Sequence, residues 1–344
     1  MITLHKQLSE RLPGIYEIRL YQGTNEIRLF LITGNNTQRH LLVDTGYNTA
    51  ENRDILDEIL KELHIDYTNL DVFLTHKHHD HTGMASHLAE LGARIYMNPL
   101  EDRHPYDCLY YSHGAKTLAE QAKVLNRIGV TETRTPALYK SFQEFNAYCQ
   151  DAASKDAFKT VDFSYTAIGR GNKFSYGDYE FHAISLPGHT LGQLGLYEPN
   201  KHIILSGDHI IKGVTPIVGT SYTNEHLLDQ YFRSLGQFKT VYRTCTVYPA
   251  HGDSFANPSV VAADITNAYR KKLLEIQHVL MNSAEALTVQ QVAFRVYGVY
   301  NLPTEASSFF KIKMILSKTF SCLEYLYDQK YCDRMEQDGM LFYR

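Results

Sequence analysis

Four histidines and one aspartate fall within the six residues from His76 to His81, in the order His-x-His-x-Asp-His. Imidazole and carboxylate groups are the ligands that zinc and similar divalent metals prefer. Imidazoles crowded together repel one another when protonated and lose hydration when buried, so folding alone gives no reason for such a cluster. The segment therefore predicts a metal site.

A centre with two metals needs about six or seven side-chain ligands, and one loop cannot supply them all. The remaining ligands are expected as isolated His or Asp residues beside glycine, at the ends of strands. Three segments fit this description: Pro187-Gly188-His189-Thr190, Ser206-Gly207-Asp208 and Pro249-Ala250-His251-Gly252. Each follows an apolar stretch with the pattern of a strand.

The elements expected to position these segments alternate between strands and helices. Residues 14–32 and 40–43 predict an opening β-meander that ends at Asp44-Thr45-Gly46, and residues 51–63 space their apolar side chains on one helical face. A short apolar strand at 71–74 leads into the histidine cluster. Further strands are expected at 93–97, 181–186, 194–197, 202–205 and 246–248. This order predicts an α/β layered sandwich.

Two parts of the chain depart from this rhythm. Residues from about 100 to 165 are too many for a plain loop, and we interpret them as an inserted helical cap, with extra packing helices as the alternative. From residue 261 three helices are expected, one of them capped by Thr288, and then a hairpin with Asp338-Gly339 at its turn. This pattern describes a winged-helix-like unit. The expected domains are therefore 1–260 and 261–344.

Composition limits the class of protein and its partners. The chain has 344 residues and a net charge of −4, which argues against a dedicated nucleic-acid binder. Residues 261–344 hold ten Lys/Arg and nine Asp/Glu, so dimerisation or closure of a pocket is expected of them rather than phosphate binding. The five cysteines are scattered, and we find neither a signal-peptide pattern nor a membrane-spanning run. We expect a cytoplasmic protein.

Five motifs in order resemble the metallo-β-lactamase superfamily over about residues 14–255. They are Asp-Thr-Gly, Thr-His-x-His-x-Asp-His-x-x-Gly (with Gly83 one place early), Pro-Gly-His-Thr, Gly-Asp and Pro-x-His-Gly. Glyoxalase II-like members, and members with a C-terminal winged helix, are the most similar within it. The resemblance implies a four-layer αβ/βα sandwich with its site at the edges of the sheets.

The resemblance also implies a role for each matching residue. His76, His78 and His189 would bind one metal, Asp80, His81 and His251 the second, and Asp208 would bridge the two. Asp44 would orient one of the ligands. The metals implied are two zinc ions, with iron or manganese as alternatives. The second histidine of the motif is not replaced by Glu, as it is in the redox-active diiron branch, which favours hydrolysis.

Such a centre suits the hydrolysis of a small ester-like substrate, above all an acyl thioester. Two metals can share a hydroxide ion, because coordination lowers the pKa of a bound water molecule toward ~7. Asp80 and Asp208 would hold this hydroxide in place. A thiol with a pKa near ~8.5 then leaves without strong acid assistance. We expect His209, directly after Asp208, to take part in catalysis, either by reaching the substrate or as a proton donor. Substrate contacts are expected from Tyr110, Tyr111, His113 and Tyr222.

Three other functions remain open. An endoribonuclease or phosphodiesterase, as in some winged-helix members, would show a basic groove leading from the metals. A mononuclear iron persulfide dioxygenase would hold iron in one site and consume oxygen. A regulatory protein on the same scaffold would be free to lose ligands, and all seven are present here. A small-molecule substrate and a homodimer are expected as partners.

Overall fold

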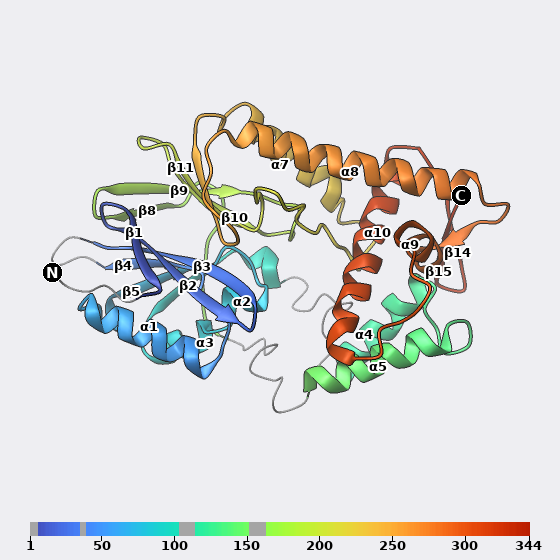
Figure 1. Ribbon diagram of the computed structural model, residues 1–344, viewed down its shortest axis with the longest axis horizontal. Helices are drawn as coiled ribbons and strands as arrows, with labels where there is room; N and C mark the ends of the chain where they lie inside the picture. Colours follow the sequence, from blue (N-terminus) through green and yellow to red (C-terminus); the bar gives the residue numbers. More distant parts are fainter. Residues whose placement is uncertain (1–5, 35–38, 103–113, 151–162) are drawn as a thin grey trace.

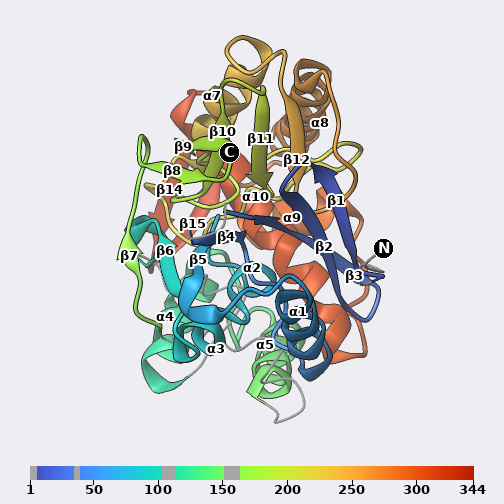
Figure 2. The ribbon, with the colours of Figure 1, turned by 90° about the vertical axis from the view of Figure 1, so that its left-hand side faces the viewer.

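The structure, a computed structural model, describes residues 6–34, 39–102, 114–150 and 163–344. Two sheets lie face to face, and helices cover both outer faces (Figure 1). In Figure 2 the helices α1 and α3 lie at one end of this stack and α7 and α8 at the other, with the strands between them. The predicted four-layer αβ/βα sandwich is confirmed.

The first sheet has seven strands paired in chain order. They are β1 (Leu8–Leu12), β2 (Ile15–Gln22), β3 (Asn25–Ile32), β4 (His40–Val43), β5 (Leu70–Phe73), β6 (Arg94–Met97) and β7 (Thr166–Ala167). The strands β1 to β4 form the predicted meander, and β4 to β7 run parallel. Helices α1 (Ala50–Glu62) and α3 (Ala85–Glu90) cover its outer face, where Ile59 and Leu88 pack with Val72.

The second sheet has five strands in the order β12-β11-β10-β9-β8. Their bounds are Lys173–Tyr176 (β8), Tyr179–Ser185 (β9), Leu194–Glu198 (β10), Ile203–Gly207 (β11) and Thr246–Pro249 (β12). Helices α7 (Leu227–Lys239) and α8 (Pro258–Met281) cover its outer face. Between the two sheets, Phe30 and Phe73 pack against Phe181 and Leu205, which buries the inner faces of both.

Loops from both sheets meet at one edge of the sandwich. The strands β4 and β5 are parallel neighbours in the first sheet, and β11 and β12 are parallel neighbours in the second. Their carboxyl ends therefore point the same way within each sheet. The two edges are joined where the N–H of Leu194 donates to the carbonyl of Thr75 at 2.9 Å.

The C-terminal part contains the three expected helices and the expected hairpin. After α8 come β13 (Leu287–Thr288), α9 (Val289–Tyr297), the short 3-10 helix η3 (Ala306–Phe309) and α10 (Phe310–Asp328). Thr288 caps α9, as predicted, and the structure shows that it does so in a capping box with Gln291. The strands β14 (Arg334–Gln337) and β15 (Met340–Tyr343) form the hairpin, and its turn residues Asp338 and Gly339 both have positive φ. The winged-helix assignment itself stays a prediction.

The helices α4 (Gly114–Arg127) and α5 (Pro136–Gln150) of the insertion pack on this C-terminal part (Figure 1). The 3-10 helix η2 (Pro99–Asp102), at the start of the insertion, is bonded instead to the loop after β9. The rings of Phe142 and Phe309 lie 4.9 Å apart, centre to centre, and Asn126 donates to the carbonyl of Asp338 at 3.0 Å. Across the described ranges, no helix combines the length and the apolar character that a membrane span requires.

Candidate metal centre

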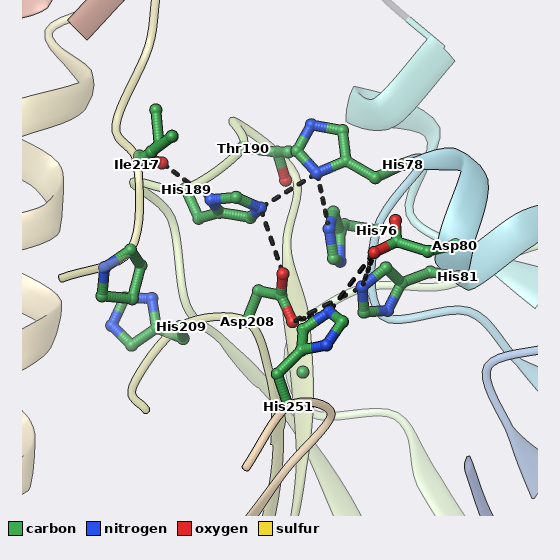
Figure 3. Close-up of polar contacts among 12 residues, drawn as sticks. His76, His78, Asp80, His81, His189, Thr190, Asp208, His209, Ile217 and His251 are labelled. Carbon is green, nitrogen blue, oxygen red and sulfur yellow. Dashed lines mark hydrogen bonds and ion pairs between the residues drawn. The ribbon is translucent and has the colours of Figure 1, made fainter. Parts of the chain in front are cut away.

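All seven side chains that the resemblance implies as ligands lie together at the edge of the sandwich (Figure 3). They come from four loops, which follow β5, β9, β11 and β12. The short helix α2 (His79–Thr82) carries two of them. They divide into two groups, and within each group the ligand atoms lie within 4.8 Å of one another: His76, His78 and His189, and then Asp80, His81, Asp208 and His251.

The three-histidine group is His76, His78 and His189. Nδ1 of His78 lies 2.9 Å from Nε2 of His76 and 2.9 Å from Nε2 of His189. The opposite ring nitrogens are held elsewhere: Nδ1 of His189 lies 2.7 Å from the carbonyl of Ile217, and Nδ1 of His76 lies 3.0 Å from the hydroxyl of Thr75. Such contacts fix the tautomer and orientation of a ligand. Each ring therefore turns one nitrogen toward a shared point.

The second group has two carboxylates, and Asp208 faces both groups. Its Oδ2 lies 3.7 Å from Nε2 of His189, while its Oδ1 lies 3.4 Å from Nε2 of His81 and 3.5 Å from Nε2 of His251. Oδ2 of Asp80 lies 3.3 Å from the same nitrogen of His251. Asp208 therefore lies between the two groups, where a residue that bridges two metals would have to lie.

Two buried ligand atoms lack a hydrogen-bond partner, which indicates whether a metal fits this site. Nε2 of His81 and Oδ1 of Asp208 are both buried and, despite their proximity, neither makes a hydrogen bond of acceptable geometry. Buried polar atoms left in this state are costly, and each one needs an explanation. A divalent cation would satisfy both atoms. Imidazole nitrogens and carboxylate oxygens are also the donor set that zinc accepts.

The two groups differ in charge. Burial and the neighbouring imidazole of His189 together lower the pKa of His78 to about 3. Burial also lowers the pKa of His76 and of His189, so the three-histidine group is neutral and presents lone pairs. Burial would raise the pKa of Asp208, but the imidazoles of His251 and His81 outweigh it and hold that pKa well below its usual value. Burial opposes protonation of His251, yet Asp208 and Asp80 raise its pKa to about 9.

Asp44 supports the second group through a contact with His81. It follows β4 directly and adopts a positive φ of 63°, a conformation that costs a non-glycine residue free energy. Its carboxylate lies 2.8 Å from Nδ1 of His81 and accepts the N–H of Thr75 at 2.8 Å. It also accepts the hydroxyl of Thr75. Asp44 thus lies where the resemblance places it, whereas the part played by Thr75 was not predicted.

The ligands open into a cavity of about 540 Å³. One wall is apolar: it is formed by the loop after β11 and by the first turns of α10. Its residues are Ile211, Val214, Pro216, Ile217, Phe310 and Met314. Gln22, Asn25, Tyr47, His79 and Thr215 complete the described lining together with five of the ligands, His78, Asp80, His189, Asp208 and His251. Among the described residues that line the cavity there is no Lys or Arg.

The structure does not place the predicted proton donor or Tyr222 in this cavity. His209 is fully buried, and its ring packs against Tyr231 and Phe238 at centroid distances of 4.9 and 5.7 Å. Burial lowers its pKa to about 3, so it is neutral. Tyr222 lines a separate small pocket with Asp328. The described residues therefore give no support to either role, and both stay predictions.

The other predicted substrate contacts, Tyr110, Tyr111 and His113, lie outside the described residues. Apolar residues that the sequence analysis did not single out line the described cavity instead. No local signal distinguished Phe310 and Met314 from the core residues of the same helix, because their position depends on where α10 begins relative to the sandwich.

A family model for the metallo-beta-lactamase superfamily matches residues 29–235, and the chain belongs to this superfamily. Two solved structures show the same fold over nearly the whole chain. A metallo-beta-lactamase family protein from Thermus thermophilus is 20% identical with a TM-score of 0.70, covering 97% of this chain and 99% of that one. A beta-lactamase domain protein from Burkholderia ambifaria is 20% identical with a TM-score of 0.78, covering 99% and 95%.

Two curated relatives match shorter stretches. A protein of Emericella nidulans named atrochrysone carboxyl ACP thioesterase is 39% identical over 107 residues, which is 30% of this chain. The match spans only 33% of that thioesterase. An uncharacterized protein of Aquifex aeolicus is 23% identical over 192 residues, covering 56% of this chain and 69% of the relative.

Proposed function

We propose that the protein hydrolyses acyl thioesters at a centre of two divalent metal ions, with zinc as the first candidate. The observation that carries the proposal is the pair of ligand groups joined by Asp208 at the cavity. Metals held there would lower the pKa of a water molecule toward ~7 and polarise the carbonyl of the substrate. The protein itself orients the ligands, supplies the negative charge of Asp80 and Asp208, and seats the acyl group.

The described lining favours a leaving group that needs no proton. A thiol has a pKa near ~8.5 and departs as a thiolate, whereas an amide nitrogen must be protonated. The predicted donor His209 is buried among aromatic rings, away from the cavity. The likeness to a protein named as a thioesterase, over 107 residues, supports the same substrate class.

The apolar wall favours an uncharged acyl group on a pantetheine-type carrier. Glutathione carries two carboxylates and a phosphodiester carries a phosphate, and each would be recognised best by cations. No cation stands in the described lining. The glyoxalase II-like and phosphodiesterase alternatives therefore have less support. Since Phe310 and Met314 come from α10, the C-terminal part would act here by closing the pocket.

A substrate panel on protein of known metal content tests this proposal. The panel contains benzoyl- and octanoyl-pantetheine thioesters, S-lactoylglutathione, a lactone and bis(p-nitrophenyl) phosphate. We expect kcat/KM for the two pantetheine thioesters to exceed the others at least about tenfold, because burying an apolar side group stabilises binding by roughly 1.5–3 kcal/mol. Activity confined to the phosphodiester would overturn the proposal. So would a single iron with oxygen consumption on glutathione persulfide.

Met314→Ala is expected to change acyl selectivity. Removing this part of the wall should raise KM for octanoyl-pantetheine about tenfold and leave the acetyl thioester unaffected, because only the longer chain reaches the apolar wall. Met281→Ala is the matched control, since Met281 is 84% exposed at the end of α8. Steady-state kinetics with both thioesters measure the effect, and an equal change for both would contradict it.

A further inference from the structure

Glu101 is a buried carboxylate in η2, with 6% of its surface exposed. Its Oε2 accepts the N–H of Lys77 at 2.8 Å. Lys77 lies between His76 and His78, so this bond holds the loop that carries two ligands of the three-histidine group. Nothing in the sequence distinguished Glu101 from other glutamates.

The other oxygen of Glu101 holds the loop of the third ligand. Oε1 accepts the hydroxyl of Thr190 at 2.8 Å and the N–H of Gly192 at 2.7 Å. Thr190 follows His189 directly. One carboxylate therefore joins the two loops on which all three histidines stand.

The fit between η2 and the His189 loop is close. A Cβ at Gly192 would lie 2.7 Å from Oε1 and 2.9 Å from the backbone nitrogen of Glu101, so this position tolerates only glycine unless the loop moves. Asn98 donates to the carbonyl of Gly192 at 2.7 Å from the same side. The loop is thus bonded to the segment around Glu101 at three points.

We propose that Glu101 is a positioning residue that fixes the spacing of these two loops and thereby sets the metal affinity of the three-histidine group. The inference rests on the proposed metal centre. The ligand nitrogens of the group converge at 2.9 Å, so a small displacement of one loop separates them. Both oxygens of Glu101 face donors only. A glutamine there would turn its amide N–H toward another N–H or O–H group, and some of the hydrogen bonds that join the two loops would be lost.

Glu101→Gln tests the inference through metal binding as well as activity. In equilibrium dialysis against zinc, the wild-type protein should bind two ions per chain. In the variant one binding step should weaken about 10–100-fold while the other stays unchanged. A His189→Ala variant identifies which step belongs to the three-histidine group. Excess zinc should restore thioesterase activity to Glu101→Gln, which it would not do for a protein that is merely misfolded.

Glu324→Gln is the matched control. Glu324 is another buried glutamate, 3% exposed, whose carboxylate accepts the hydroxyl of Tyr343 at 2.7 Å and pairs with Arg334, within the C-terminal part. Its variant should lose stability and keep both zinc affinities. If Glu101→Gln fails to fold, Thr190→Val removes one donor to the carboxylate and should weaken the same step several-fold, whereas Thr190→Ser should not.

The outcomes separate the two proposals. A wild-type protein that binds neither zinc nor iron nor manganese would refute the proposed function. A wild-type protein that binds two ions, beside a folded Glu101→Gln variant with unchanged affinities, would refute the positioning role alone. Unchanged affinity in a folded Thr190→Val variant would count against the positioning role in the same way.

Discussion

Asp208→Asn is expected to lower thioester hydrolysis by at least about 10³-fold, and the variant should retain fewer than two metal ions. Asp208 turns one oxygen to each ligand group, 3.7 Å from Nε2 of His189 and 3.4 Å from Nε2 of His81. Asparagine keeps the shape but loses the charge and one coordinating oxygen. Metals supply several kcal/mol to the transition state, and each 1.36 kcal/mol is a factor of ten in rate. Measuring kcat and metal content on one preparation checks both effects.

Asp229→Asn provides the control for loss of a carboxylate. Asp229 pairs with Arg233 at 2.8 Å on α7, where the arginine side chain is 79% exposed. Exposed pairs of this kind contribute about 0–1 kcal/mol, so its activity and metal content should match the wild type. If Asp208→Asn kept wild-type turnover with two bound ions, Asp208 would not bridge the centre.

Gly83→Ala is expected to lower the free energy of unfolding by about 3 kcal/mol, the upper end of the usual cost of overpacking. The added Cβ would lie 2.5 Å from the carbonyl oxygen of Gly46, 2.6 Å from that of His79 and 2.7 Å from the nitrogen of Asn48. All three are backbone atoms, so no side chain can rotate away to make room. Chemical denaturation of metal-free protein measures the loss.

Gly236→Ala is the matched glycine control. Gly236 lies within α7, and a Cβ there would meet nothing within 4 Å. Alanine is favoured over glycine in a helix by about 1 kcal/mol, so this variant should be more stable than the wild type. Equal stability of Gly83→Ala and the wild type would show that the turn after β4 and α2 are not in close contact.

The order of strands and helices around the site could be predicted because each element has a local hydrophobic pattern. The strand expected at 71–74 is β5 (Leu70–Phe73), and the cap expected at Thr288 is observed. Strands that run in the same direction within one sheet, as β9, β11 and β12 do, deliver their following residues to the same edge. The resemblance placed the motif after β5 at the same site. The motifs after β5, β9, β11 and β12 were therefore expected to meet, and they do.

The direction of individual side chains could not be predicted from their place in the chain. Asp208 and His209 are consecutive, yet Asp208 faces the ligand groups and His209 lies between aromatic rings under α7. The chain turns directly after β11, where the N–H of His209 donates to the carbonyl of Ser206 at 3.2 Å, and this turn sends the two side chains in different directions. Proximity in sequence to a ligand therefore gave His209 no access to the cavity. Tyr222 lies outside the described lining of the cavity, because its loop lies beside the end of α10.

The sequence by itself determined the chemistry of the centre, because the ligand types and their glycine-flanked positions are properties of single residues and short segments. Only the tertiary structure decided what holds and surrounds that centre. Glu101 bonds to the two loops of the three-histidine group, and Thr75 donates to Asp44. Phe310 and Met314 line the cavity from α10. Each of these contacts joins residues far apart in the chain. Such contacts depend on how layers and helices pack, and packing leaves no local pattern in the sequence.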